Sequence, residues 1–155
     1  MTIPVEVRLG AAPHNREDAV RAAGALLAEA GHTEAAYTNS LLQREKVANT
    51  FLGQGLAIPH GMVEDKHLVL RTGLAVLQVP GGVRWGDDSK QARLVVAIAA
   101  ASDQHIAVLR RLTRLMRDDA LMERLATTQD AQEIVRALTG EESTTAPEST
   151  ALEDF

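Results

Sequence analysis

The run Leu94-Val95-Val96-Ala97-Ile98-Ala99 is apolar at every position. A second run, Leu74-Ala75-Val76-Leu77-Gln78-Val79, is apolar at every position but one. A strand with one face in water alternates polar and apolar residues, whereas a strand that is covered on both faces is apolar almost throughout. Both runs are therefore predicted to be strands with helices packed on each side.

Helical periodicity precedes and follows these strands. Asn15 can cap a helix over 15–31, in which alanines and leucines recur at helical spacing. A second helix is predicted over 34–46, and three more over 103–139, with breaks near Asp118 and Thr128. Helices before, between and after strands indicate a single α/β domain with a mixed, mostly parallel β-sheet flanked by α-helices.

Glycine and proline mark the remaining boundaries. Pro80-Gly81-Gly82 and Trp85-Gly86-Asp87-Asp88 are predicted to be turns. The shorter segment Gly55-Leu56-Ala57-Ile58-Pro59 is predicted to be a strand that leads directly into His60-Gly61. The sequence therefore places a histidine in a tight turn at the end of a strand.

Length and composition narrow the classes of protein. A chain of 155 residues with 45% hydrophobic and 24% charged residues is typical of one ordinary globular domain. It has neither an apolar run of about 18 to 20 residues nor a basic start followed by an apolar stretch, so we expect a cytoplasmic protein without membrane insertion. The absence of cysteine excludes disulfides, thiolate metal sites and cysteine nucleophiles. Histidine becomes the leading candidate for covalent chemistry.

The charge of the chain is unevenly distributed. The last 15 residues hold five of the 21 acids and no Lys or Arg, which leaves 16 acids against 16 basic residues in the rest. A neutral body argues against nucleic acid as a partner, since binding to backbone phosphates needs an excess of positive charge. We expect residues 1–140 to form the domain and residues 141–155, rich in Ser, Thr, Glu and Pro, to be a disordered acidic tail.

The turn at Pro59-His60-Gly61 is the first candidate for chemistry. Proline restricts the backbone and glycine permits unusual geometry, so the turn would hold an imidazole on a stiff support. A neutral imidazole nitrogen can attack phosphorus at cytosolic pH, and the phosphoramidate that forms can donate onward. The alternative is an ordinary turn histidine.

His105 is the second candidate, because it should lie in the first turn of a helix that follows an apolar strand. Helix N-terminal amides bind anions, and ligands of open α/β sheets bind at the carboxyl ends of strands. His105 shares a helical face with Leu109, Leu112 and Met116, which predicts that it leans toward the core. The alternative is a core histidine that is satisfied by a backbone carbonyl.

Arg44 is the third candidate. It falls on the helical stripe of Tyr37 and Leu41, so we expect its guanidinium to point inward, where it needs an anionic partner. That partner could be a carboxylate such as Glu64 or Asp65, or a bound phosphoryl group.

The other histidines are less informative. His14, His32 and His67 lie in polar or loop contexts, and we expect each to be solvated. A metal site made of His60, His67 and His105 is a weaker hypothesis, because nothing in the sequence brings His67 near the other two. We therefore expect neither a metal nor a cofactor.

Several of these segments occur together in a known family. They are Leu42-Gln43-Arg44-Glu45-Lys46, Phe51-Leu52-Gly53, Ala57-Ile58-Pro59-His60-Gly61, Gly82-Val83-Arg84-Trp85-Gly86 and Ala92-Arg93-Leu94-Val95, followed by His105-Ile106. In order and spacing they resemble the mannitol-type enzyme IIA family of the sugar phosphotransferase system, over about residues 3 to 140. The sequence differs from the family pattern at Gln54, where an acidic residue is common.

The resemblance implies a phosphoryl carrier. His60 would accept a phosphoryl group from the phosphocarrier HPr and donate it to a cysteine of the IIB domain of a mannitol-type permease. The resemblance also implies that Arg44 binds the phosphoryl oxygens and that His105 hydrogen-bonds the phosphorylated imidazole or its phosphate. We expect a free-standing component, because the chain has neither a IIB cysteine nor a membrane span. The alternative is a regulatory IIA-like protein of the nitrogen-related branch, which signals by binding proteins according to its phosphorylation state.

Overall fold

The computed structural model describes residues 3–101 and 103–140. The acidic segment 141–155, predicted to be a disordered tail, lies outside these residues. In chain order the elements are β1 (Val5–Arg8), α1 (Arg16–Glu29), α2 (Tyr37–Val47), β2 (Phe51–Gly53), β3 (Leu56–Ala57), the 3₁₀ helix η1 (Val63–Leu68), β4 (Gly73–Trp85), β5 (Asp87–Ala99), α3 (Gln104–Leu115), α4 (Asp119–Thr127) and α5 (Ala131–Thr139).

The five strands form one mixed sheet in the order β1-β4-β5-β3-β2. β1 pairs with β4, and β3 with β5, in parallel; β4–β5 and β2–β3 are antiparallel. The predicted mixed sheet flanked by helices is confirmed, but parallel pairs make up only half of the pairings. The sheet is less parallel than predicted, because β4 and β5, the two long central strands, are joined directly as an antiparallel hairpin.

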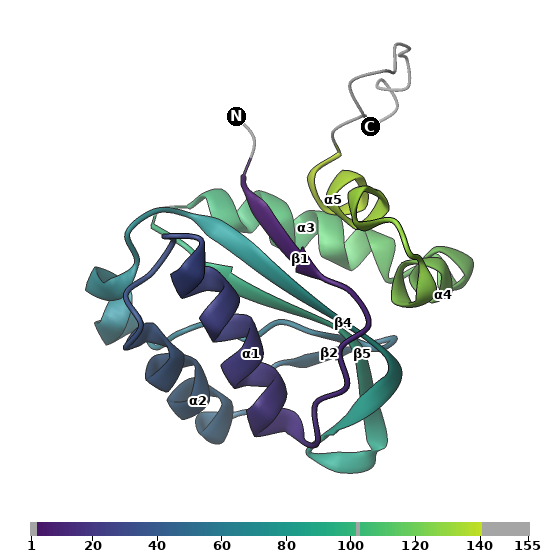
Figure 1. Ribbon diagram of the computed structural model, residues 1–155, viewed down its shortest axis with the longest axis horizontal. Helices are drawn as coiled ribbons and strands as arrows, with labels where there is room; N and C mark the ends of the chain where they lie inside the picture. Colours follow the sequence, from purple (N-terminus) through teal and green to yellow (C-terminus); the bar gives the residue numbers. More distant parts are fainter. Residues whose placement is uncertain (1–2, 102, 141–155) are drawn as a thin grey trace.

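The sheet lies between two layers of helices (Figure 1). One face of β4 and β5, including Ala75, Leu77, Val95 and Ala97, packs with buried residues of α1 and α2. The opposite face, which includes Val76 and Val96, packs with buried residues of α3, α4 and α5. Successive strand side chains point to opposite faces, so an unbroken apolar run supplies both cores. This confirms the prediction made from 74–79 and 94–99.

The polar exception in the first run, Gln78, is buried at 2% exposure. Its side-chain amide donates to the carbonyls of Leu125 and Thr128, both at 2.9 Å, while its oxygen accepts from the backbone N–H of Gly10 at 3.0 Å. These bonds satisfy a buried polar group and attach the end of α4 to the sheet.

Most predicted helices are confirmed, with small shifts. Asn15 caps α1, and its side chain accepts a hydrogen bond from the backbone N–H of Asp18. The three helices that follow the last strand are separated near Asp118 and near Thr128, as predicted. The second helix begins at Tyr37, three residues later than predicted. No helix in the described ranges is long and apolar enough to cross a membrane.

One predicted turn is wrong. Pro80-Gly81-Gly82 lies inside β4, where the pairing with β5 shifts register between Gln78 and Val83. An irregularity of this kind lets a strand absorb proline and glycine without ending. The reversal between the two long strands comes at Gly86, which has a φ of 102°, as predicted for the second turn.

Candidate functional site

His60 lies at the carboxyl end of β3, next to β5. After β3 the chain continues alongside β5, so that His60 forms a parallel bridge with Ile98, whose N–H donates to the carbonyl of Pro59 at 2.9 Å. The parallel pairing of β3 and β5 brings the carboxyl ends of both strands to one edge of the sheet. Ligands of open α/β sheets bind at such an edge.

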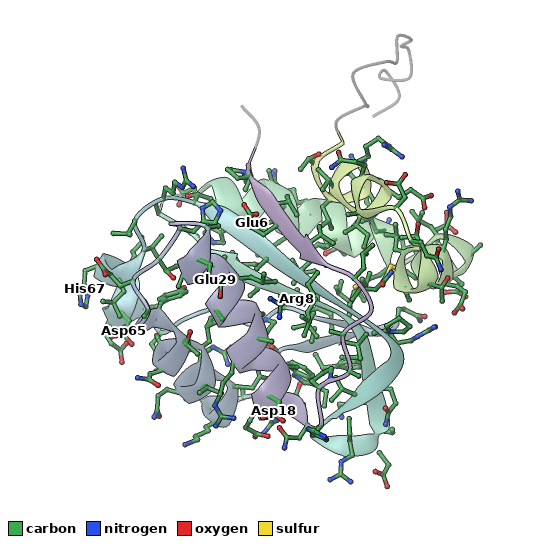
Figure 2. The ribbon with its side chains drawn as sticks, in the orientation of Figure 1. Glu6, Arg8, Asp18, Glu29, Asp65 and His67 are labelled. Atoms are coloured by element: carbon green, nitrogen blue, oxygen red, sulfur yellow. The ribbon has the colours of Figure 1, made fainter. Side chains whose placement is uncertain are left out.

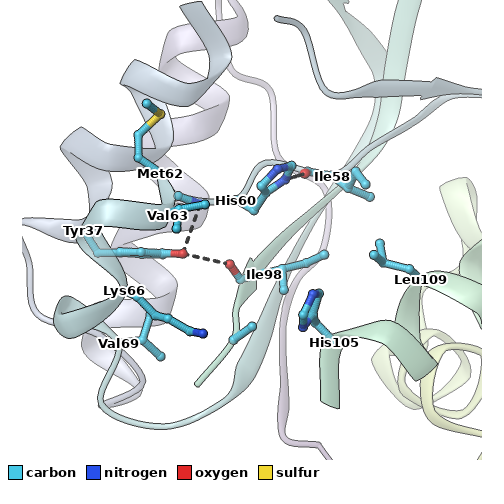
Figure 3. A pocket seen from close by; sticks show the side chains of 12 residues that line it. Tyr37, Ile58, His60, Met62, Val63, Lys66, Val69, Ile98, His105 and Leu109 are labelled. Carbon is cyan, nitrogen blue, oxygen red and sulfur yellow. Dashed lines mark hydrogen bonds between the residues drawn. The ribbon is translucent and has the colours of Figure 1, made fainter. Parts of the chain in front are cut away.

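The imidazole of His60 is held in one orientation. Its Nδ1 lies 2.9 Å from the carbonyl oxygen of Ile58 (Figure 3). A carbonyl only accepts hydrogen bonds, so Nδ1 carries the proton of the neutral ring and Nε2 keeps its lone pair. The half-buried ring therefore presents one defined nucleophilic nitrogen.

Tyr37 fixes the turn from the side of α2. Its hydroxyl accepts from the N–H of Gly61 at 3.0 Å and donates to the carbonyl of Ile98 at 3.4 Å (Figure 3). Burial raises the pKa of Tyr37, the Gly61 hydrogen bond opposes this, and the nearby charge of Asp65 adds to it. The phenol therefore stays protonated at neutral pH and can make both bonds.

Gly61 is required by this contact. A Cβ at position 61 would lie 2.5 Å from Cε1 of Tyr37, and Gly61 is not among the glycines with positive φ. The glycine of the Pro-His-Gly turn therefore permits close approach of the Tyr37 ring, not the unusual backbone geometry that the sequence suggested.

Replacing Tyr37 by Phe is expected to destabilise the fold by about 1–2 kcal/mol, since the N–H of Gly61 loses its acceptor at a part-buried position. The ring still fills its site, so the variant should remain folded. Urea denaturation of wild type and variant measures the difference. Equal stabilities would show that water replaces the phenol and that the bond does not hold the turn.

His60 and His105 line the same pocket, of about 290 Å³. His105 is half-buried in the first turn of α3, as predicted, and reaches the pocket from the opposite layer to Tyr37 (Figure 3). Most of the other lining residues are apolar, among them Ile58, Val69, Ile98 and Leu109. The structure thus brings two of the three predicted site residues together in a pocket large enough for a phosphoryl group beside the ring.

Arg44 is not among the pocket residues, and its predicted inward orientation is wrong. Its Nη1 donates to the carbonyl of Ala48 at 2.6 Å, in an exposed bond at the C-terminal end of α2. Within the described residues neither Glu64 nor Asp65 forms an ion pair with it. A cation here satisfies a terminal carbonyl and complements the helix dipole.

Glu45 takes the inward position instead. It is 4% exposed, and its carboxylate accepts from the N–H of Thr50 at 2.7 Å, from the Thr50 hydroxyl at 2.7 Å and from Nε1 of Trp85 at 2.8 Å. Steps of four residues place Tyr37, Leu41 and Glu45 on one face of α2. The inward residue is therefore Glu45, one position after the residue that the sequence suggested, Arg44.

The three remaining histidines behave differently from one another. His14 is 92% exposed, and His67 is exposed and points away from the sheet (Figure 2). His32 is fully buried, so its predicted solvation is wrong: Nδ1 accepts from Arg71 at 3.2 Å, and Nε2 lies 3.4 Å from a Glu6 oxygen. The described residues contain no cluster of three or more potential metal ligands.

Lys66 is a site residue that sequence reasoning missed. It lines the pocket from η1, the 3₁₀ helix that follows the His60 turn. The sequence offers one signal, a lysine six positions after His60, but a loop lysine is ordinarily assigned to solvent.

The sequence also matches a family described as "Phosphoenolpyruvate-dependent sugar phosphotransferase system, EIIA 2", over residues 5–140. The chain belongs to this family. As an EIIA domain it is 51% identical over 155 residues to a multiphosphoryl transfer protein of Xanthomonas campestris pv. campestris, covering 98% of this chain but only 18% of that protein. It thus spans less than a fifth of the length of that relative.

Two solved structures have the same fold. The crystal structure of IIA mannitol from Escherichia coli aligns with a TM-score of 0.80 at 41% identity and covers 86% of this chain and 96% of that one. A complex of enzyme IIAMTL with phosphorylated enzyme IIBMTL from Escherichia coli aligns with a TM-score of 0.80 at 40% identity, covering 88% and 95% of the two chains. This EIIA domain therefore resembles proteins of the mannitol system over nearly its whole described length.

Proposed function

We propose that this EIIA domain is a phosphohistidine carrier that accepts a phosphoryl group on Nε2 of His60 from phospho-HPr. The observation that carries the proposal is the 2.9 Å contact between Nδ1 and the Ile58 carbonyl, which leaves Nε2 as the nucleophile of a neutral ring. The pocket beside that ring supplies room for the phosphoryl group.

The proposed reaction has two steps, and in each step one bond to phosphorus forms while another breaks. In the first, the Nε2 lone pair attacks phosphorus, the bond from phosphorus to the donor breaks, and its electron pair leaves with the donor. In the second, a thiolate of the IIB partner attacks phosphorus and the electron pair of the P–N bond returns to Nε2. Nδ1 keeps its proton and its Ile58 contact throughout, so the ring needs no rotation between acceptance and donation.

The proposed acceptor is the IIB domain of a mannitol-type permease. Support comes from the likeness to IIAMTL, which was solved in complex with phosphorylated IIBMTL. Transient complexes use small interfaces. The exposed Val63 lines the pocket on η1, and the exposed Ile106 follows His105 on α3. This role places the domain in the cytoplasm, without contact with nucleic acid.

The test is stepwise transfer of labelled phosphate from phospho-HPr to this chain, and then to isolated IIB domains offered one at a time. Rapid delivery to a mannitol-type IIB domain supports the proposal that the chain is a carrier for sugar transport. Labelling of the chain without delivery to any IIB domain would instead favour a regulatory, nitrogen-type protein.

We propose that His105 stabilises the phosphoryl group in the transition state of transfer, through a hydrogen bond from its ring. Replacing it by Ala should leave His60 able to take up label but slow the transfer about a hundredfold, as loss of one positioned donor to developing charge costs about 3 kcal/mol. Rapid-quench measurements of acceptance and donation give the two rates separately. Transfer at the wild-type rate would make His105 a pocket-wall residue without a role in the chemistry.

A further inference from the structure

Lys66 is the only lysine or arginine among the described residues that line the pocket of His60 and His105. Figure 3 shows its side chain entering the pocket, with Nζ directed toward the side of His105. Its place on η1 ties it to the turn of His60, since only five residues separate the two. A single cationic group thus accompanies the two imidazoles.

The charge of Lys66 is not committed elsewhere in the described part of the chain. No described carboxylate lies within 4.0 Å of its Nζ, whereas Lys90 pairs with Asp87 at 3.2 Å. Its side chain is exposed, so the long stem can move toward a ligand at little cost in packing.

A phosphoryl group on Nε2 would bring up to two negative charges into a pocket whose lining is mostly apolar. Such a charge requires a cation or several hydrogen-bond donors. Arg44 donates to the Ala48 carbonyl outside the pocket, and an imidazole in its neutral form donates one hydrogen bond without carrying a charge. Among the described residues that line the pocket, Lys66 is therefore the cation placed to neutralise the phosphoryl oxygens.

We propose that Lys66 binds the phosphoryl oxygens on His60, in both the acceptance and the donation step. The proposal rests on the proposed function of His60. A lysine suits this role as a mobile point charge, which can follow the phosphoryl group as it enters and leaves, whereas an arginine fork would favour one fixed geometry.

The first experiment measures single-turnover transfer from phospho-HPr to the chain, and from the phosphorylated chain to a IIB domain. Lys66→Met should slow both steps about tenfold. This loss is smaller than that for a fully buried charge contact, because the site is open to water. Lys66→Arg should stay within about threefold of wild type, and Lys46→Met, which removes an exposed lysine outside the pocket, should match wild type.

The second experiment separates phosphoryl binding from partner docking. A ³¹P NMR titration of the isolated, phosphorylated chain gives the pKa of the phosphoryl group with no partner present. A nearby cation favours the dianion and lowers this pKa, so Lys66→Met should raise it by about half a unit and Lys66→Arg should not. A lysine that only contacts HPr or IIB would leave the titration unchanged.

Unchanged transfer rates in Lys66→Met or an unchanged ³¹P titration would each overturn the proposal. Failure of the proposed function is a different result: wild-type chain that takes up no label on His60. Full labelling of Lys66→Met on His60 at a reduced rate distinguishes the two, since it shows His60 to be the carrier while the rate reports on Lys66.

Discussion

His60→Ala is expected to take up no phosphoryl label from phospho-HPr, the largest effect of any single substitution in this chain. The orientation of the ring explains why no neighbour can replace it. Its Nε2 is the nitrogen left with a lone pair at the carboxyl ends of β3 and β5, and the Ile58 carbonyl fixes that assignment. Alanine removes the nucleophile while leaving the strand pairing in place.

The bond formed on the wild type provides an independent check. A phosphoramidate should be lost in acid and survive in base, unlike a phosphoserine ester. The matched control is His14→Ala, which removes a histidine that is 92% exposed and lies outside the pocket; it should label fully. Stable stoichiometric label on His105 of the His60→Ala chain would reverse the roles of the two histidines.

Glu45→Leu is expected to lower the free energy of unfolding by about 3–5 kcal/mol, the largest effect on stability proposed here. Leucine removes the acceptor of three donors at once, namely the N–H and hydroxyl of Thr50 and the indole N–H of Trp85. Buried donors without acceptors cost about 1–3 kcal/mol each, partly offset by relief of the buried charge. Trp85 is fully buried, so water cannot easily replace the carboxylate.

Urea denaturation followed by the fluorescence of Trp85, the single tryptophan, measures this loss. Glu29→Leu is the matched control, because Glu29 is a helical glutamate that is exposed on α1; its effect should stay within about 0.5 kcal/mol. A loss below about 1 kcal/mol in Glu45→Leu would show that the Thr50 and Trp85 donors find other partners.

The layers of the fold could be predicted because they depend on local pattern. Two apolar runs require cover on both faces, and the Asn15 cap and the alanine–leucine periodicity of α1 are readable in a few residues. β1 was not predicted, because the alternation Val5-Glu6-Val7-Arg8 is only four residues long, too short to indicate a strand without its partner β4. Its existence depends on a partner about 70 positions away.

The site was predictable in part for a related reason. His60 and His105 follow strands, and strand order brings their carboxyl ends together. Arg44 and Glu45 are adjacent on α2, and a helical stripe read at steps of three or four admits either one. Only the positions of Thr50 and Trp85, which supply donors to an inward group, select the glutamate.

Contacts between distant segments explain the other two differences. His32 lies between Arg71 and Glu6, on separate elements, so no window of sequence reveals its burial. Lys66 has the pattern of a solvated loop residue, and only the fold brings it to the pocket that Ile98 of β5 also lines. Both placements depend on tertiary structure.

One strand carries both halves of the site. β5 bridges the backbone of His60 through Ile98, and His105 follows in the first turn of α3, six residues after β5 ends at Ala99. Because both imidazoles are attached to β5, we expect their spacing to change little when a partner docks on either helical layer. In the proposed function, one pocket would serve both the donor and the acceptor of the phosphoryl group, and the surface around the pocket would distinguish the two partners.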